Sequence, residues 1–152
     1  MTFLLHLSSK RDDYMLVKVF LLMFFCVSAH AQGVLGKWRT IDDQTGKPIS
    51  IVEIFEHRGK IFGRVVDILD PKARHKVCTN CEGEDKGKPI IGLTIIKGLT
   101  RNGQRYTGEI LDPQHGNIYS CNISLENRDR LKVRGFLGFS LLGRTQYWHR
   151  VN

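Results

Sequence analysis

The chain has 152 residues, of which 41% are hydrophobic and 25% charged, and its formal net charge is +8 at pH 7. This composition is typical of a single globular domain and excludes a fibrous or intrinsically disordered protein. The longest apolar run is too short to cross a bilayer, and the sequence has no phosphate-binding glycine loop, zinc-binding histidine helix, nucleophile elbow or EF-hand loop. We therefore expect a protein that is not an enzyme and needs no cofactor.

Residues 1–31 have the three parts of a secretory signal peptide. Lys18 supplies the positive charge, residues 19–27 form an apolar stretch of nine, and Ala29-His30-Ala31 is a small-x-small cleavage site. A buried amphipathic helix would have a polar face, which this stretch lacks. We expect translation from Met15, a signal helix within residues 1–31 that is cleaved after Ala31, and export to the periplasm or the medium as one domain of residues 32–152.

The expected mature chain keeps a large positive charge. Residues 1–31 contain three basic and two acidic side chains, which leaves a net charge of +7 for residues 32–152. Such a surplus attracts anionic lipid head groups and other polyanions, so a peripheral contact with the cell envelope is a possible interaction. We expect no nucleic-acid partner, because the sequence shows no surface pattern of alternating basic and aromatic residues.

The sequence after Ala31 predicts a series of β-hairpins. Two segments resemble each other, since both begin with Gly-Lys-Pro-Ile, turn at a central glycine and end with Ile-Leu-Asp-Pro. The second of these turns contains Asn102-Gly103, a pair that favours a type I′ turn. In chain order, the predicted strand regions and hairpins are residues 34–40, 46–71, 87–113, 118–137 and 142–151.

About eight strands joined mostly by short turns predict an all-β fold, a single antiparallel up-and-down β-barrel. A two-sheet sandwich is the alternative. Closure into a barrel removes the exposed edge strands that an isolated meander would have. An eight-stranded barrel is just wide enough to be filled by its own side chains or to hold one small ligand.

Two motifs at opposite ends of this region belong together. Gly36-Lys37-Trp38 lies on the first predicted strand, and Trp148-His149-Arg150 lies on the last. The arrangement resembles the calycin barrels, the lipocalins and fatty-acid-binding proteins, in which a basic residue near the chain end covers the tryptophan of a Gly-x-Trp motif. The resemblance implies structural roles for Gly36, Trp38 and Arg150, with a cation–π contact that closes one end of the barrel.

A longer series of motifs resembles one bacterial family of exported proteins, catalogued as domain of unknown function 2147. That family has no established activity, so the resemblance implies an architecture and no catalytic residues. The blocks that carry it are residues 38–43, 46–48, 78–83, 89–92, 110–113, 134–138 and 143–150, together with Gly116 and Tyr119.

The turn at residues 112–116 contains two further residues with structural roles, Asp112 and Gly116. Pro113 fixes φ, and Gly116 can take the left-handed conformation that ends such a turn. Asp112 is expected to accept hydrogen bonds within the turn and not to act as an acid.

Cys78 and Cys81 form a Cys-x-x-Cys pair in the long segment between the two similar hairpins. In an exported protein we expect a disulfide between them. A zinc site is an alternative that would need His75 and a fourth ligand, and a redox site is another that would need a thiol of low pKa. Cys121 is predicted to be a buried free thiol on the apolar face of its strand.

Residues 134–150 combine glycines, large apolar residues and arginines. They predict either a bulged core strand or an apolar portal flanked by guanidinium groups.

We expect the barrel to bind a small apolar or amphipathic anionic ligand. The alternatives are an envelope interaction protein without a cavity that uses its basic surface, and a metal or redox function at the cysteine pair. The candidate ligand-binding residues are Trp38, Arg39, Tyr119, Arg134, Arg144 and Trp148.

Overall fold

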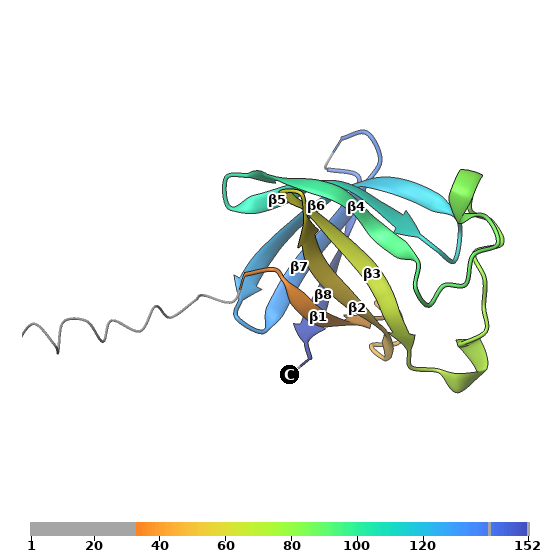
Figure 1. Ribbon diagram of the computed structural model, residues 1–152. Helices are drawn as coiled ribbons and strands as arrows, with labels where there is room; N and C mark the ends of the chain where they lie inside the picture. Colours follow the sequence, from red (N-terminus) through yellow and green to blue (C-terminus); the bar gives the residue numbers. More distant parts are fainter. Residues whose placement is uncertain (1–32, 140, 152) are drawn as a thin grey trace, which may run out of the picture. The chain divides into compact units, whose positions relative to one another are not determined.

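The computed structural model describes residues 33–139 and 141–151, and its strands form one closed antiparallel barrel (Figure 1). Each strand pairs with the next along the chain, and the last strand returns to pair with the first. The predicted up-and-down barrel is confirmed and the sandwich is excluded. The expected signal helix lies outside the described residues. The strands are β1 (Gly36–Ile41), β2 (Pro48–His57), β3 (Lys60–Ile68), β4 (Thr94–Asn102), β5 (Arg105–Asp112), β6 (Asn117–Asn127), β7 (Arg130–Phe136) and β8 (Gly143–Arg150).

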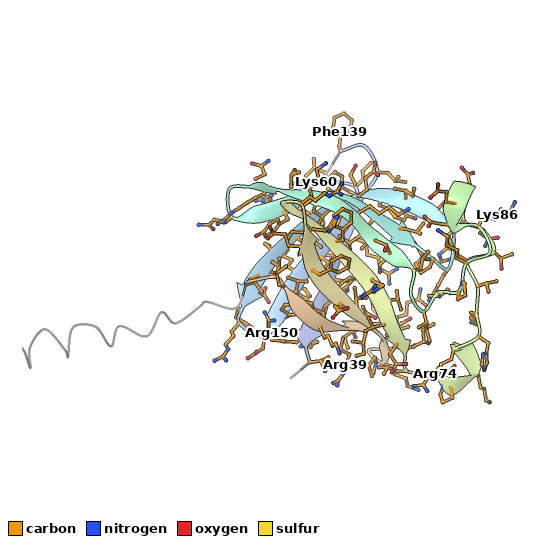
Figure 2. The ribbon with its side chains drawn as sticks, in the orientation of Figure 1. Arg39, Lys60, Arg74, Lys86, Phe139 and Arg150 are labelled. Carbon is orange, nitrogen blue, oxygen red and sulfur yellow. A yellow bond between two sulfur atoms is a disulfide. The ribbon has the colours of Figure 1, made fainter. Side chains whose placement is uncertain are left out.

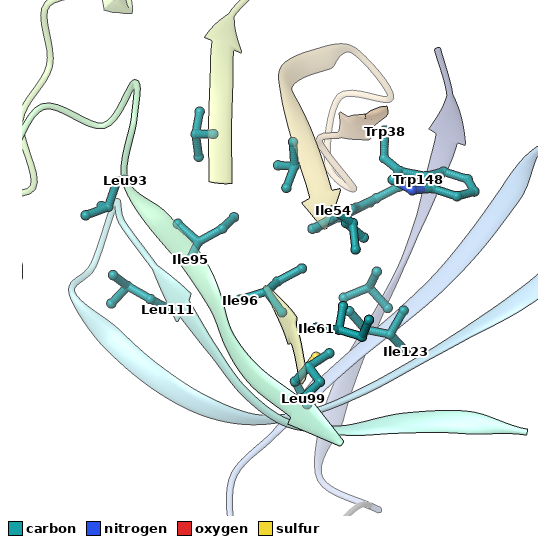
Figure 3. Packing of buried hydrophobic residues seen from close by; sticks show 14 of the residues in the cluster. Trp38, Ile54, Ile61, Leu93, Ile95, Ile96, Leu99, Leu111, Ile123 and Trp148 are labelled. Atoms are coloured by element: carbon teal, nitrogen blue, oxygen red, sulfur yellow. The ribbon is translucent and has the colours of Figure 1, made fainter. Parts of the chain in front are cut away.

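A cluster of buried apolar side chains, to which every strand contributes, packs the end of the barrel where β8 finishes and continues to the segment between β3 and β4 (Figure 3). Burying each such side chain contributes about 1.5–3 kcal/mol, so this cluster is the main source of stability. Its largest fully buried members are Trp38, Trp148, Ile54, Ile96, Leu99, Ile123 and Leu131.

Arg150 covers Trp38 at this packed end. The guanidinium carbon lies 4.1 Å from the centroid of the indole ring, and the indole nitrogen donates to the carbonyl oxygen of Val34 at 2.8 Å. The three guanidinium nitrogens also donate to backbone carbonyls, so the arginine ties the chain end to two other segments. Those acceptors belong to Gly33 at 2.8 Å, Leu35 at 2.9 Å and Arg128 at 2.8 Å.

The seam that closes the barrel is short. Strands β1 and β8 pair only at Trp38 with Arg150 and at Arg39 with His149. Beyond these pairs the two strands no longer form a ladder, although both continue toward the other end of the barrel. The barrel wall is therefore least tightly closed near Ile41 and Gly143.

The long connection between β3 and β4 forms a structured loop at the end of the barrel where β1 finishes, opposite the end that Arg150 covers. It contains the short 3-10 helices η1 (Pro71–Ala73) and η2 (Gly83–Asp85). A disulfide joins Cys78 to Cys81, as predicted. The Cys78 sulfur lies 3.3 Å from the carbonyl oxygen of Pro113, so the loop packs against the β5–β6 turn.

In the part of the chain that the structure describes, no helix has the length and apolar character needed to cross a membrane.

Candidate functional site

A cavity of about 860 Å³ opens at the end of the barrel where β1 and β7 end and β2 and β8 begin. This end is opposite the one that Arg150 closes. The volume lies within the range of roughly 300–1,000 Å³ that is usual for small-molecule sites. The barrel is thus filled by its own side chains at one end only.

The inner wall of the cavity is apolar. It is formed by apolar residues of β2, β4, β5, β7 and β8 and of the loop between β7 and β8. Such a wall releases water when it contacts an apolar group. The apolar lining residues include Ile49, Ile95, Ile110, Leu111, Val133, Phe136, Leu137, Leu142 and Trp148.

Gly135 leaves part of this wall bare. It follows Val133 by two positions on β7, so both residues face the interior. A Cβ atom placed on Gly135 would lie 3.7 Å from Cβ of Tyr119 and 3.8 Å from Cγ2 of Ile110, which are ordinary contact distances. A side chain at this position would fit the backbone and would occupy the cavity.

The mouth of the cavity is polar and carries charges of both signs. Arg144 at the start of β8 forms an ion pair with Asp43, which follows β1. This pair spans the part of the β1–β8 seam that has no strand ladder. Because Asp43 already neutralises Arg144, an anionic ligand that reaches the guanidinium has to displace that carboxylate.

Asp42 lies beside this pair but serves the β1–β2 turn. Its carboxylate accepts hydrogen bonds from the backbone nitrogens of Thr45 at 2.8 Å and Gln44 at 2.9 Å. These bonds favour the charged form and hold the pKa of Asp42 below its usual value. Asp42 is therefore a fixed negative charge at the mouth and a poor proton donor at neutral pH.

Asp112 and His115 contribute the opposite side of the mouth. The carboxylate of Asp112 accepts from the backbone nitrogen of Gln114 at 2.9 Å and lies 2.8 Å from Nδ1 of His115. The carboxylate thus organises its own turn, as its position before Pro113 suggests.

The structure brings three of the candidate ligand-binding residues to the cavity and places three elsewhere. Tyr119, Arg144 and Trp148 line the cavity. Trp38 is fully buried under Arg150 at the packed end, and Arg39 is exposed on the outer face of β1. Arg134 is also absent from the lining, and its guanidinium donates to Oγ1 of Thr145 at 2.9 Å and to the carbonyl of Leu141 at 3.4 Å.

Sequence reasoning missed the polar residues between the mouth and the apolar wall. Thr40, Ser50 and Gln146 line the cavity, and Oε1 of Gln146 accepts the indole hydrogen of Trp148 at 3.2 Å. The signal was present in the two-residue period of a strand, because Gln146 alternates with Arg144 and Trp148. The same period places Arg134 on the opposite face from Gly135.

The cysteine pair offers no thiolate to a metal in this structure, because its two sulfurs are bonded to each other. Among the described residues, no three His, Cys, Asp or Glu side chains are grouped so that they could hold a metal ion. The chemistry of the site therefore comes from an apolar cavity, its polar mouth and one arginine.

Comparison with known proteins agrees with this architecture. A family model described as an uncharacterized protein conserved in bacteria (DUF2147) matches residues 36–150. A solved structure with a similar fold is described as protein HP1028 from the human pathogen Helicobacter pylori, which belongs to the lipocalin family. The two chains are 20% identical, with a TM-score of 0.69 over 78% of this chain and 83% of that one, a likeness that concerns the fold alone. No curated protein sequence matches the chain.

Proposed function

The chain belongs to the DUF2147 family, and we propose that its barrel binds a small amphipathic ligand with an apolar body and an anionic end. The observation that supports this proposal is the cavity of about 860 Å³, which is apolar inside and has Arg144 at its mouth. The apolar body lies against Val133, Trp148 and the bare backbone of Gly135. The anionic end lies at the mouth, where it stays partly hydrated.

Arg144 is the group that binds the anionic end. A guanidinium presents paired donors that match a carboxylate or a phosphate, so a ligand of this type can exchange with Asp43. Asp42 stays bound to the turn backbone and keeps its negative charge. The site therefore favours one anionic group placed directly on Arg144 over a ligand with several charges.

Binding without catalysis fits the mouth of the cavity. The carboxylates of Asp42 and Asp112 are both occupied by backbone hydrogen bonds within their own turns. Both line the cavity at its mouth, where these bonds engage them as parts of turns.

Filling the cavity tests whether it is the binding site. The probe is dodecanoate, and its binding is followed by fluorescence of the buried tryptophans. Gly135→Val should weaken binding by roughly tenfold or more, because the new side chain takes the place of the acyl chain. Ser120→Val, on the outer face of the neighbouring strand β6, is the matched control and should leave binding unchanged. Equal affinity of the two variants would refute the cavity as the site.

Changing the ion pair tests the anionic end. Arg144→Gln should weaken dodecanoate binding by roughly tenfold, whereas Asp43→Asn should strengthen it by roughly two- to fivefold because the guanidinium is released. Dodecanol has the same chain without the charge, so neither change should alter its binding. If Arg144→Gln reduced both affinities equally, the ligand would not be recognised by its charge.

The proposal includes export to the periplasm or the medium. It is supported by the signal pattern of residues 15–31 and by the disulfide, which forms in oxidising compartments. Expression of the full chain followed by fractionation should give an exported protein whose N-terminal residue is Gln32. A protein found only in the cytoplasm with residues 1–31 still attached would contradict export.

A further inference from the structure

The loop between β7 and β8 presents large apolar side chains to solvent. The most exposed large hydrophobic residues in the described part of the chain are all in this loop: Leu137 (63%), Phe139 (80%), Leu141 (89%) and Leu142 (76%). Single exposed apolar residues are common, but a contiguous group of this size on a soluble protein marks an interaction surface.

The tip of the loop projects from the barrel (Figure 2). The backbone nitrogen of Leu142 donates to the carbonyl oxygen of Phe139 at 3.1 Å, and Arg134 donates to the carbonyl oxygen of Leu141 at 3.4 Å. The first bond closes the tip of the loop, and the second joins the loop to β7. Figure 2 shows Phe139 at the tip, beyond the rest of the barrel.

The charged side chains of the β7–β8 hairpin itself are all basic. From Arg130 to the C-terminus the sequence contains five arginines or lysines and no aspartate or glutamate. Arg134 lies three residues before Leu137, and Arg144 lies two residues after Leu142. Asp43, the acidic residue that contacts this hairpin, is paired with Arg144.

An apolar tip between guanidinium groups matches the layers of a lipid surface. The acyl boundary accepts the apolar side chains, and the head groups above it supply negative charge to the arginines. A protein partner would need one socket that combines both features, whereas an anionic bilayer offers them at every point of its surface.

We propose that the β7–β8 loop inserts into the surface of an anionic lipid bilayer. Leu137 and Leu142 belong both to the loop and to the cavity lining, so the docked barrel has its mouth against the membrane. The route by which a ligand passes from bilayer to cavity rests on the proposed function. The docking itself depends on the loop alone.

A reporter at the tip tests this inference in the full chain. Phe139→Trp places an indole where insertion should occur, and Leu35→Trp, exposed at the packed end of the barrel, is the control. Phosphatidylcholine vesicles with brominated acyl chains are used with and without phosphatidylglycerol. We expect quenching of Trp emission in Phe139→Trp to be several-fold stronger with the anionic lipid, and no added quenching in Leu35→Trp. Vesicle binding by the full chain would not by itself identify the loop, because the apolar residues 19–27 can also bind lipid. A reporter placed at the loop tip separates the two.

A second change separates the loop from the ligand site. Leu141→Ser, made in the Phe139→Trp chain, should weaken vesicle binding by roughly tenfold and leave dodecanoate binding unchanged, because Leu141 does not line the cavity. Docking is overturned by an unquenched reporter at position 139, by equal quenching at position 35, or by a blue shift at position 139 that needs protein concentration and no vesicles. Intact quenching with failed dodecanoate binding would refute the proposed function and leave the docking in place.

Discussion

At the scale of single residues, Arg150 joins the two ends of the barrel chain. It contacts the Trp38 ring and donates to three backbone carbonyls. Gly36 makes room for it, since a Cβ atom there would lie 3.0 Å from Nη1 of Arg150. One side chain therefore fixes the N-terminal segment, the β6–β7 turn and the start of β1.

Replacing this arginine should destabilise the fold. Arg150→Met keeps the apolar stem over Trp38 but removes the hydrogen bonds and the cation–π contact, so we expect a loss of about 1–3 kcal/mol in the free energy of unfolding. Arg39→Met, on the outer face of β1, should change it by less than about 0.5 kcal/mol. Urea denaturation measures both values, and equal stabilities would show that Arg150 does not clamp the barrel.

Cys121 is a buried thiol whose environment suppresses its chemistry. Burial raises its pKa to about 12, so the thiolate is scarce at neutral pH. In a Cys26→Ser chain, which removes the cysteine of residues 1–31, a thiol reagent should detect no thiol in the native state and one after unfolding without reductant. Detection of three thiols in the unfolded, unreduced protein would contradict the disulfide.

At the scale of elements, Gly116 determines how the β5–β6 turn meets the disulfide loop. Its φ is +76°, and a Cβ atom would lie only 2.0 Å from the carbonyl oxygen of Asn80. Gly103 has a similar φ of +61° with nothing within 4 Å, so it provides a control for backbone strain alone.

Gly116→Ala should therefore be more destabilising than Gly103→Ala. Both variants lose about 1 kcal/mol from the positive φ, and the first should lose a further 1–3 kcal/mol because the loop backbone must move. Thermal unfolding of the two variants measures the difference. Equal melting temperatures would show that moving the loop backbone at Asn80 costs no measurable stability.

The loop between β3 and β4 is also held by charge. Asp85 pairs with Lys97 on β4, and this contact lowers the pKa of Asp85 from its ordinary value of 3.8. A lowered pKa gives stability that is present above pH 3.8 and is lost as the pH falls through the lowered value. Asp85→Asn should reduce the free energy of unfolding by about 1 kcal/mol at neutral pH and by much less at acidic pH. Denaturation curves at both pH values test this, and a difference independent of pH would contradict the ion pair.

The strands were predictable because alternation and turn residues are local signals. The residues that form the two hairpin turns match the expectation in one case and differ by one position in the other. Arg58 and Gly59 both have positive φ, at 51° and 74°, as a type I′ turn requires. Asn102, the more typical residue for that role, instead ends β4 and pairs with Arg105, so Gly103 and Gln104 form the turn. The bulge in β4 between Lys97 and Thr100 sets this register, and long-range pairing of that kind is not encoded in a dipeptide.

At the scale of the whole molecule, the sequence predicted a barrel but not how far it is filled. Tyr119, Arg144 and Trp148 could be selected because they are large or charged residues on predicted strands. Trp38 is also a large residue on a predicted strand, but its side chain is fully buried in the core and does not line the cavity. The distinction depends on which end of the barrel each strand position occupies, and that requires the register of all eight strands.

The cavity is also defined by a residue that sequence reasoning tends to overlook. Gly135 contributes to the site by having no side chain, and a glycine in a strand is more often a sign of bending. Its role becomes visible only when Tyr119 and Ile110 are placed opposite it.

The most direct test of the account is an NMR measurement of contacts between dodecanoate and the protein. If the acyl chain occupies the cavity, we expect nuclear Overhauser effects from its protons to the Trp148 indole and the Val133 methyl groups. We also expect the Arg144 side-chain resonances to shift as the carboxylate replaces Asp43. Acyl contacts confined to the outer surface, with Val133 and Trp148 unperturbed at saturation, would contradict it.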